Sequence, residues 1–105
     1  MISKTPKPPY YAVIFTSMKS GYSKEYDETS NRMVQLARNQ EGFLGVESAR
    51  NEIGITVSYW DSLENIKKWK NNLEHKIARQ KGKDDWYSEF KVRICLIERD
   101  YEFKK

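Results

Sequence analysis

The sequence predicts a small α+β domain in which a four-stranded antiparallel sheet carries two helices on one face. Three observations lead to this fold class. Strand and helix patterns follow one another in the order strand, helix, strand, strand, helix, strand. Only two residues separate the two central strand patterns, which is typical of a β-hairpin. The closing strand pattern alternates apolar and mixed residues, as expected for a sheet with one covered face.

The first elements are an arm and a strand. Residues 1–9 contain all three prolines of the chain, and proline cannot donate the backbone hydrogen bonds of a regular ladder. We therefore expect an extended N-terminal arm over residues 1–9 and a single domain over residues 10–105. The domain opens with residues 10–17, whose aromatic and β-branched side chains predict a strand.

A helix and a hairpin follow the first strand. From about residue 22 to residue 40, apolar side chains recur at spacings of three and four residues. This spacing predicts an amphipathic helix that ends near Gly42. Residues 43–50 and 53–60 then form the predicted antiparallel hairpin.

The last third of the chain predicts one more helix and one more strand. Asp61 or Ser62 can cap a helix that begins near Leu63 and ends by Gly82. The last strand is expected over residues 89–101, and the face that we expect to take the helices holds Phe90, Val92, Ile94 and Leu96. The complete order is that of the ferredoxin-like βαββαβ fold with a four-stranded antiparallel sheet.

Composition narrows the classes of partner. The net charge is +4, but four lysines in the terminal segments carry this excess, and the other 15 Lys and Arg balance 15 Asp and Glu. We therefore expect no nucleic-acid partner, and we interpret the basic run over residues 67–83 as a solvated helix face. No apolar run approaches the ~20 residues of a membrane span. We therefore expect no membrane association. The lone cysteine, Cys95, excludes an intrachain disulfide, which fits a reducing compartment, so we expect a cytoplasmic protein.

The sheet face without helices predicts a partner. All four strand patterns are rich in apolar and aromatic residues, so a monomer would expose a large apolar patch on that face. Either a ligand or a second copy must cover it. A homodimer that packs sheet to sheet about a two-fold axis satisfies this requirement.

Several segments carry a family resemblance. They are the opening Tyr-Ala-Val-Ile-Phe, the Gly-Phe-Leu-Gly of residues 42–45, the Gly-Ile-Thr-Val-Ser-Tyr-Trp of residues 54–60, Ile66-Lys-Lys-Trp69, His75 with Ala78, and the closing residues 93–99. Over residues 10–102 the chain resembles the antibiotic biosynthesis monooxygenase family of dimeric α+β barrels. The resemblance implies a homodimer with a cavity in each subunit between the sheet and the helices. It also implies one of several chemistries, because some relatives oxidise polyketide-type phenols with molecular oxygen alone and others degrade haem.

The resemblance to the haem-degrading relatives is incomplete. Those proteins depend on an asparagine in the first strand, a tryptophan on the second helix and a histidine ten residues later. Trp69 matches the tryptophan, but Arg79 stands at the histidine position and residues 10–17 contain no asparagine. These departures argue against haem degradation. Motifs for flavin, nucleotide or zinc are also absent from the sequence, so we expect no cofactor.

His75 is the only histidine and therefore the only candidate for a general base of that type. On one continuous helix it would lie about 180° from Ile66, the centre of the apolar stripe, and would face solvent. It could turn inward only if the helix breaks at Asn71 and Asn72. We interpret His75 as solvent-facing or packed at an edge, with catalysis as the alternative.

Aromatic residues are the candidate walls of a pocket. Trp69 lies on the apolar stripe of the second helix, and Trp60 ends a strand nearby. Each is interpreted first as a core residue, which does not exclude a cavity wall, because a buried indole N–H needs a partner or a ligand. Tyr11 and Tyr59 supply further rings of the same kind.

A polar group is expected on the mixed faces of the sheet. Arg93 and Ser58 should lie there with Glu47 nearby. An arginine facing a glutamate predicts an ion pair in the dimer interface, and the alternative is an anchor for an enolate or carboxylate. Cys95, on the same face, is interpreted as a small buried apolar residue.

The leading hypothesis is a homodimeric, cofactor-independent monooxygenase that acts on a small aromatic or polyketide-like compound. In it, Trp60 and Trp69 shape the pocket, Arg93 pairs with the substrate anion and His75 acts as a base if the helix breaks. The alternative is a non-catalytic dimer that binds a small apolar ligand. A haem-binding protein is the third hypothesis.

Overall fold

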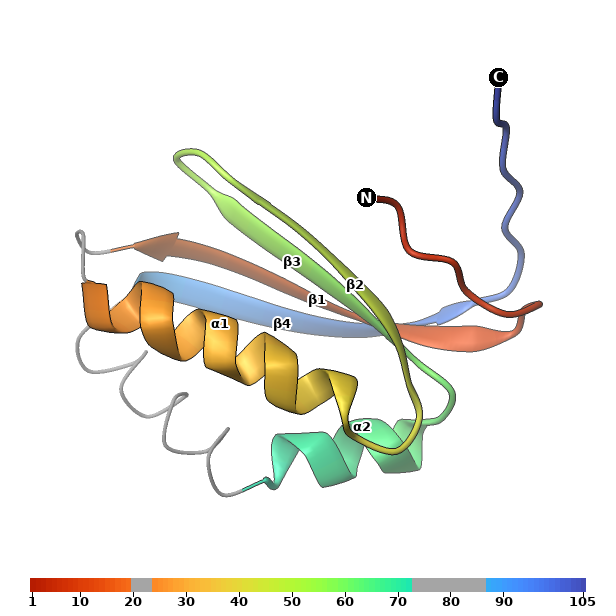
Figure 1. Cartoon of the computed structure of the whole chain (residues 1–105), viewed down its shortest axis with the longest axis horizontal. Helices are drawn as coiled ribbons and strands as arrows, with labels where there is room; N and C mark the ends of the chain where they lie inside the picture. Colours follow the sequence, from red (N-terminus) through yellow and green to blue (C-terminus); the bar gives the residue numbers. More distant parts are fainter. Residues whose placement is uncertain (20–23, 73–86) are drawn as a thin grey trace.

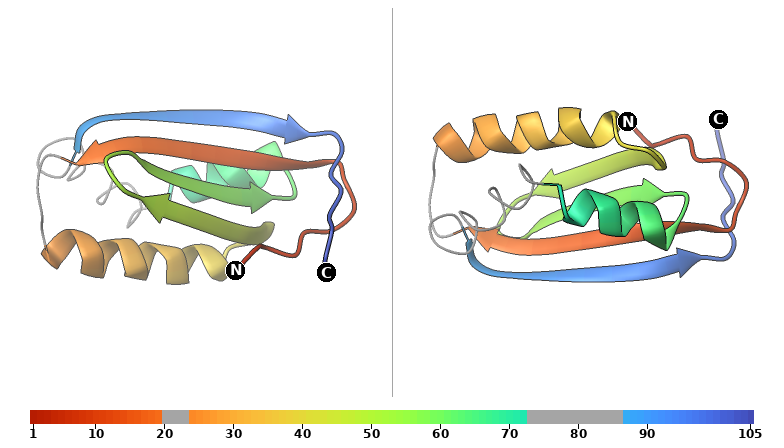
Figure 2. Two further views of the ribbon diagram at one scale, coloured as in Figure 1. Left: turned by 90° about the horizontal axis from the view of Figure 1, so that it is seen from above. Right: turned by 90° about the horizontal axis from the view of Figure 1, so that it is seen from below.

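The computed structural model describes residues 1–19, 24–72 and 87–105. It contains, in chain order, β1 (Tyr10–Lys19), α1 (Lys24–Arg38), β2 (Phe43–Arg50), β3 (Gly54–Trp60), α2 (Leu63–Lys70) and β4 (Tyr87–Ile97). The strands form one antiparallel sheet in the order β2-β3-β1-β4. Both helices lie on the same side of this sheet, as Figures 1 and 2 show. The ferredoxin-like order expected from the sequence is confirmed.

Strand register assigns each side chain to one of two faces, because neighbouring residues of a strand point in opposite directions. Tyr11 of β1 is aligned with Trp60 of β3 and Leu96 of β4. Since Trp60 stacks on Trp69 of α2, this row lies on the side of the helices, which we call the helix-covered face. The opposite side, the helix-free face, carries the row that begins with Tyr10.

The helix-covered face holds most of the core. Trp60 of β3 and Ile66 of α2 are buried there, and so is Ala37 of α1. At the far end of this face, the guanidinium of Arg50 donates a hydrogen bond to the hydroxyl of the buried Ser17. The rings of Phe15, Tyr87 and Phe90 pack together at the same end.

The turn into α2 is determined by local side chains. Ser62 caps the helix, and its hydroxyl accepts a hydrogen bond from Asn65 N–H at 3.1 Å. The amide of Asn65 also donates to Asp61 Oδ1 at 2.8 Å. Gly42 has a φ of 84°, and a Cβ atom there would collide with the side chains of Asp61 and Asn65. The conformation and the close packing both require glycine at this position.

Two element ends differ from the sequence expectation by more than two residues. β4 ends at Ile97 instead of Tyr101, because Ile97 is already aligned with Tyr10, the first residue of β1. The two prolines that precede Tyr10 have no N–H group and cannot extend the ladder. α2 ends at Lys70 with Asn71 as its C-cap, whereas the apolar pattern predicted a helix that continues toward Gly82. Residues 73–86 lie outside the described part of the chain.

The helix-free face carries both terminal segments. Figure 1 shows the N-terminal arm running over this side of the sheet and the C-terminal segment leading away from the sheet on the same side. Apolar side chains of Met18 and Ile55 remain 40% and 45% exposed on the uncovered part of the face. No described helix is both long enough and apolar enough to cross a membrane.

Candidate functional site

Two tryptophans stack between the sheet and α2. The rings of Trp60 and Trp69 are 6.2 Å apart with an interplanar angle of 26°, and Phe43 packs edge-on against Trp60 at 5.6 Å. Trp60 is completely buried, whereas Trp69 is half-buried. A ligand beside this pair would therefore touch Trp69 rather than Trp60.

Tyr11 and Ser58 share the helix-covered face with the tryptophans. Tyr11 is aligned with Trp60 across the β1-β3 ladder. Trp60 Nε1 donates a hydrogen bond to Ser58 Oγ at 3.0 Å, so the buried indole N–H has its partner within its own strand. The structure thus brings together four of the predicted pocket residues.

The expected grouping of Ser58 with Glu47 and Arg93 is wrong. Ser58 is aligned with Val13 and Val46 on the helix-covered face, and Glu47 and Arg93 are on the other face. Side chains alternate between the two faces along a strand, so Ser58 and Val57 point to opposite faces. Val57 is in the row of Glu47 and Arg93, which places these two residues on the face opposite to Ser58.

Arg93 lies far from the tryptophans and from Glu47. It is exposed on the helix-free face and aligned with Ile14. Glu47 occupies the same row at the opposite edge of the sheet, three strand spacings or about 14 Å away. An Arg93–Glu47 ion pair within one chain is therefore not formed, and Arg93 cannot reach a ligand held beside Trp69 in the same chain.

Tyr59 belongs to a polar network on the helix-free face. Its hydroxyl donates to Glu47 Oε1 at 2.7 Å, and Glu47 Oε2 accepts the N–H of Ser3 at 2.8 Å. Burial, followed by the Glu47 hydrogen bond, raises the pKa of Tyr59 to about 12. Tyr59 is therefore a neutral phenol that holds the N-terminal arm to the sheet, and it is separated from the tryptophans by the sheet itself.

Tyr10 extends this network to the C-terminal segment. Its ring packs edge-on against Tyr59 at 5.9 Å, and its hydroxyl donates to a carboxylate oxygen of Asp100 and accepts from Thr5 at 2.9 Å. Burial, together with the Asp100 hydrogen bond, raises the pKa of Tyr10. The sequence pattern did not predict this network. Its one sequence signal is Gly45, where a Cβ atom would lie only 2.7 Å from the Ser3 side chain.

His75 lies outside the described residues, as does Arg79. The prediction that His75 faces solvent assumes one continuous helix. α2 ends at Lys70, and Asn71 and Asn72 follow in a turn in which Asn72 N–H donates to the carbonyl of Trp69 at 3.1 Å. That assumption therefore does not hold at Asn71.

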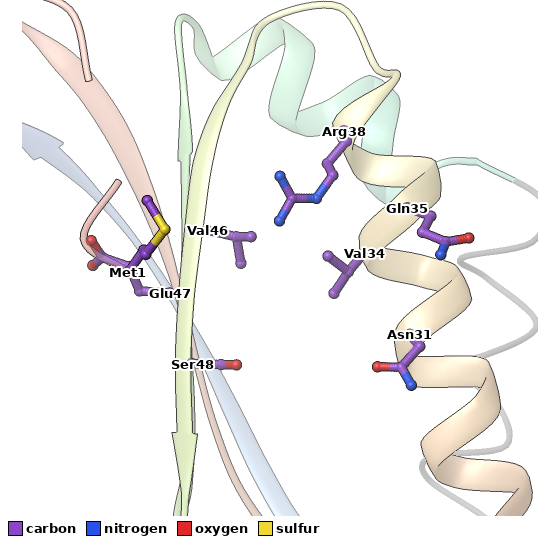
Figure 3. A pocket seen from close by; sticks show the side chains of 8 residues that line it. All are labelled: Met1, Asn31, Val34, Gln35, Arg38, Val46, Glu47 and Ser48. Carbon is purple, nitrogen blue, oxygen red and sulfur yellow. The ribbon is translucent and has the colours of Figure 1, made fainter. Parts of the chain in front are cut away.

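A polar hollow of about 580 Å³ lies between α1 and β2. Figure 3 shows Val34 and Arg38 directed from α1 toward β2, with Val46 and Ser48 directed toward α1. The hollow is open at the edge of β2 and borders neither Trp60 nor Trp69. A second hollow, of about 490 Å³, lies between the arm and the C-terminal segment. Within the described residues no cluster of three or more His, Cys, Asp or Glu could hold a metal ion.

Comparisons with known proteins are consistent with this geometry. The family model for antibiotic biosynthesis monooxygenases matches residues 9–81, which include the tryptophan pair and all of the sheet except β4. The chain belongs to the antibiotic biosynthesis monooxygenase family. This family assignment confirms the resemblance found in the sequence.

The chain is similar to one curated protein in sequence and to several solved structures in fold. The uncharacterized protein YqjZ of Bacillus subtilis is 51% identical over 99% of this chain and 93% of its own length. The solved structure of a conserved protein from Methanosarcina mazei has a TM-score of 0.74 at 11% identity, covering 83% of this chain and 91% of that one. SnoaB, a cofactor-independent oxygenase from Streptomyces nogalater, has a TM-score of 0.71 at 9% identity, covering 93% and 100%. At these identities the solved structures establish the fold alone.

Proposed function

We propose that this family member is a cofactor-independent monooxygenase that acts, as a cytoplasmic homodimer, on a small aromatic or polyketide-like compound. The observation that carries the proposal is the convergence of Tyr11, Ser58 and the stacked Trp60 and Trp69 on the helix-covered face. Family membership supports it, and so does the similarity in fold to a cofactor-independent oxygenase. The single free cysteine, Cys95, suits a reducing compartment.

The proposed reaction needs no electrons other than those of the substrate. A base removes a proton from an electron-rich phenol or anthrone, and the resulting anion transfers one electron to molecular oxygen. Recombination of the two radicals forms a carbon–oxygen bond in a peroxide. Loss of water then leaves a carbonyl group, so a CH₂ group and O₂ become C=O and H₂O. The protein contributes deprotonation, stabilisation of the anion and a dry site.

Each candidate residue has a role in this proposal. The half-buried rings of Trp69 and Tyr11 border the aromatic substrate, while Trp60 supports Trp69 from behind. His75 is the proposed base, since no other histidine exists in the chain. Arg93 lies on the helix-free face and is assigned to the dimer interface instead of the substrate.

Exposure on the helix-free face supports the homodimer. Met18 and Ile55 are about half-exposed there, beside the charged Lys91 and Arg93. A sheet-to-sheet contact between two copies would bury these apolar side chains and let the charged residues meet the partner.

Oxygen uptake tests the catalytic proposal. A panel of anthrones and hydroquinones is supplied to the wild type and to Trp69→Phe and His75→Ala, and uptake is followed with an oxygen electrode. We expect uptake by the wild type, a reduction of at least tenfold in His75→Ala and a smaller reduction in Trp69→Phe. Glu52→Gln, in the exposed turn between β2 and β3, is the matched control and should keep the wild-type rate. Wild-type uptake no faster than buffer across the panel would contradict the proposal.

A non-catalytic ligand-binding dimer is the second candidate. It is favoured by the complete burial of Trp60 and by its satisfied indole N–H, which are the features of a finished core. In that case the same aromatic compounds should quench tryptophan fluorescence in a saturable way without oxygen uptake. Titration with hemin tests the haem-binding hypothesis in parallel, because a bound haem would shift the Soret band.

A further inference from the structure

The far end of the helix-covered face holds an arginine in a fixed position. Arg50 of β2, Gly54 of β3, Ser17 of β1 and Phe90 of β4 form one row across the four strands. The Arg50 side chain lies over Gly54, where a Cβ atom would collide with the guanidinium. The guanidinium donates a hydrogen bond to the hydroxyl of Ser17, which is only 1% exposed. Gly54 and Ser17 together hold the positive charge over the sheet.

The charge of Arg50 has no counter-charge beside it. A serine hydroxyl occupies only one of the N–H donors of a guanidinium and carries no negative charge. Within the described residues Arg50 forms no ion pair. The described strands contain two carboxylates, those of Glu47 and Glu89, and both lie on the helix-free face. An anion on the helix-covered face would therefore meet this guanidinium without competition from an acidic side chain of the sheet.

Aromatic rings lie beside the guanidinium. Ser17 is aligned with Phe90, and Phe15 lies two residues before Ser17 on the same face. The rings of Phe15 and Phe90 stack at 5.5 Å, and Tyr87 packs edge-on against both. Such neighbours in a sheet are about 5–7 Å apart, so one small molecule can reach both the rings and the guanidinium. Arg50 is exposed and the three rings are only half-buried, so these groups are open to a ligand.

This pair of features matches the two parts of a small aromatic carboxylic acid. The planar fork of a guanidinium binds a carboxylate through two parallel hydrogen bonds. Aromatic rings prefer offset or edge-on contacts with another ring, which the half-buried phenylalanines can provide. A neutral aromatic compound would leave the charge unpaired, and a carboxylate without a ring would leave the apolar surface in water.

We propose that Arg50, Phe15 and Phe90 form a binding site for a small aromatic carboxylate. Arg50 pairs with the carboxylate, the two phenylalanine rings contact the ring of the ligand, and Ser17 is a positioning residue that fixes the guanidinium. The site is separate from the tryptophan pair, because Tyr11, which is aligned with Trp60, lies about 20 Å from Ser17 along β1. It depends neither on the oxygenase chemistry nor on the homodimer.

Three probes test the ligand class on the full-length, isotope-labelled protein in two-dimensional NMR spectra. Phenylacetate carries the ring and the carboxylate, phenylacetamide only the ring and acetate only the carboxylate. We expect phenylacetate to shift the backbone amide signals of Ser17, Gly54 and Phe90 in a saturable way. Phenylacetamide should bind at least tenfold more weakly, because it forms no charge-assisted pair, and acetate should cause no saturable shift. Equal affinities for phenylacetate and phenylacetamide, shifts confined to the indole N–H of Trp69, or no binding of phenylacetate would overturn the proposal.

Substitution of Arg50 identifies the cation. Arg50→Gln should weaken phenylacetate binding at least tenfold and change phenylacetamide binding less than threefold, so that the preference for the acid disappears. Lys67→Gln removes the same charge from the exposed side of α2 and is the matched control, which should keep both affinities. Phe90→Leu retains Arg50 but loses a ring, so it should weaken both aromatic ligands by a similar factor. A preference for the acid that persists in Arg50→Gln would overturn the site, and the comparison of the three probes on the wild type needs no variant that folds.

Discussion

Tyr59 and Trp60 are neighbours in β3, yet they lie in two different environments. Trp60 points to the helix-covered face, where it is completely buried in an aromatic stack with Trp69. Tyr59 points to the helix-free face, where its hydroxyl binds Glu47 and, through it, the N-terminal arm. One face is stabilised by apolar burial and the other by hydrogen bonds to a carboxylate.

The same division applies to Tyr10 and Tyr11 in β1. Tyr11 joins the tryptophans, whereas Tyr10 holds the root of the C-terminal segment through Asp100. In both strands, two adjacent residues point to opposite faces of the sheet and therefore make different kinds of contact. The helix-covered face carries the tryptophan stack, and the helix-free face holds the two terminal segments. Substitutions on the two faces should therefore affect different properties.

The largest effect is expected at Trp60. Trp60→Ala should lower the free energy of unfolding by about 3–5 kcal/mol, because it removes a fully buried ring and leaves a cavity. Urea denaturation measures the change. Ile55→Ala, in the same strand but half-exposed on the other face, should cost about 1 kcal/mol or less. Equal costs at the two positions would mean that the faces are not energetically distinct.

Glu47→Ala should have the next largest effect, on the helix-free face. It removes the acceptor of both the Tyr59 hydroxyl and the Ser3 N–H, which should lower the free energy of unfolding by about 2 kcal/mol. The arm should also become more sensitive to trypsin at Lys4, as mass spectrometry of the cleaved ends can show. Glu52→Ala, in the exposed turn between β2 and β3, is the matched control. An arm that is cleaved no faster than in the wild type would argue against this tether.

Ser58→Ala tests the hydrogen bond that the Trp60 indole makes on the helix-covered face. It leaves the indole N–H of Trp60 buried without an acceptor, which should cost about 1–2 kcal/mol in urea denaturation. Ser58→Thr keeps the hydroxyl and should recover most of this loss. If Ala and Thr behave alike, the hydrogen bond contributes little to the stability of the stack.

The smallest effect is a pH dependence of stability from Tyr59. Its pKa is about 12 in the folded chain and near 10 when exposed, so between these values the unfolded chain releases a proton that the folded chain keeps. The free energy of unfolding should therefore fall as pH rises from about 10 to about 12, and below that window Tyr59 should cause no change of stability with pH. Tyr59→Phe should flatten this part of the curve, and Tyr10 should leave a residual slope of the same sign. Identical slopes in wild type and variant would contradict the raised pKa of Tyr59.

Several features of the fold could be predicted from local patterns. The hairpin of residues 43–60 and the start of α2 at Leu63 follow from strand propensity, a two-residue turn and a capping serine. The end of β4 could not be predicted, because the pattern of alternation continues to Tyr101 while the partner strand starts only at Tyr10. A strand ends where its neighbour ends, and that is a property of the pair.

The candidate site shows the same limit. The sequence singled out five pocket residues, and the structure places all of them on one face except Tyr59, which points to the other: Trp60, Trp69, Tyr11, Ser58 and Tyr59. It also suggested that Ser58, Glu47 and Arg93 share a face, which the register contradicts. The hydrogen bond between Glu47 and Ser3 joins residues 44 positions apart, and Gly45, which leaves room for the Ser3 side chain, does not by itself predict it.

The order of elements, the family and the aromatic character of the site could all be inferred from the sequence, because periodicity, turn residues and family motifs are local properties of the chain. Which residues of neighbouring strands share a face and where β4 ends could be read only from the tertiary structure. These outcomes depend on strand register and on contacts between distant residues. A shift of one residue in register would exchange the two faces without changing a single local pattern.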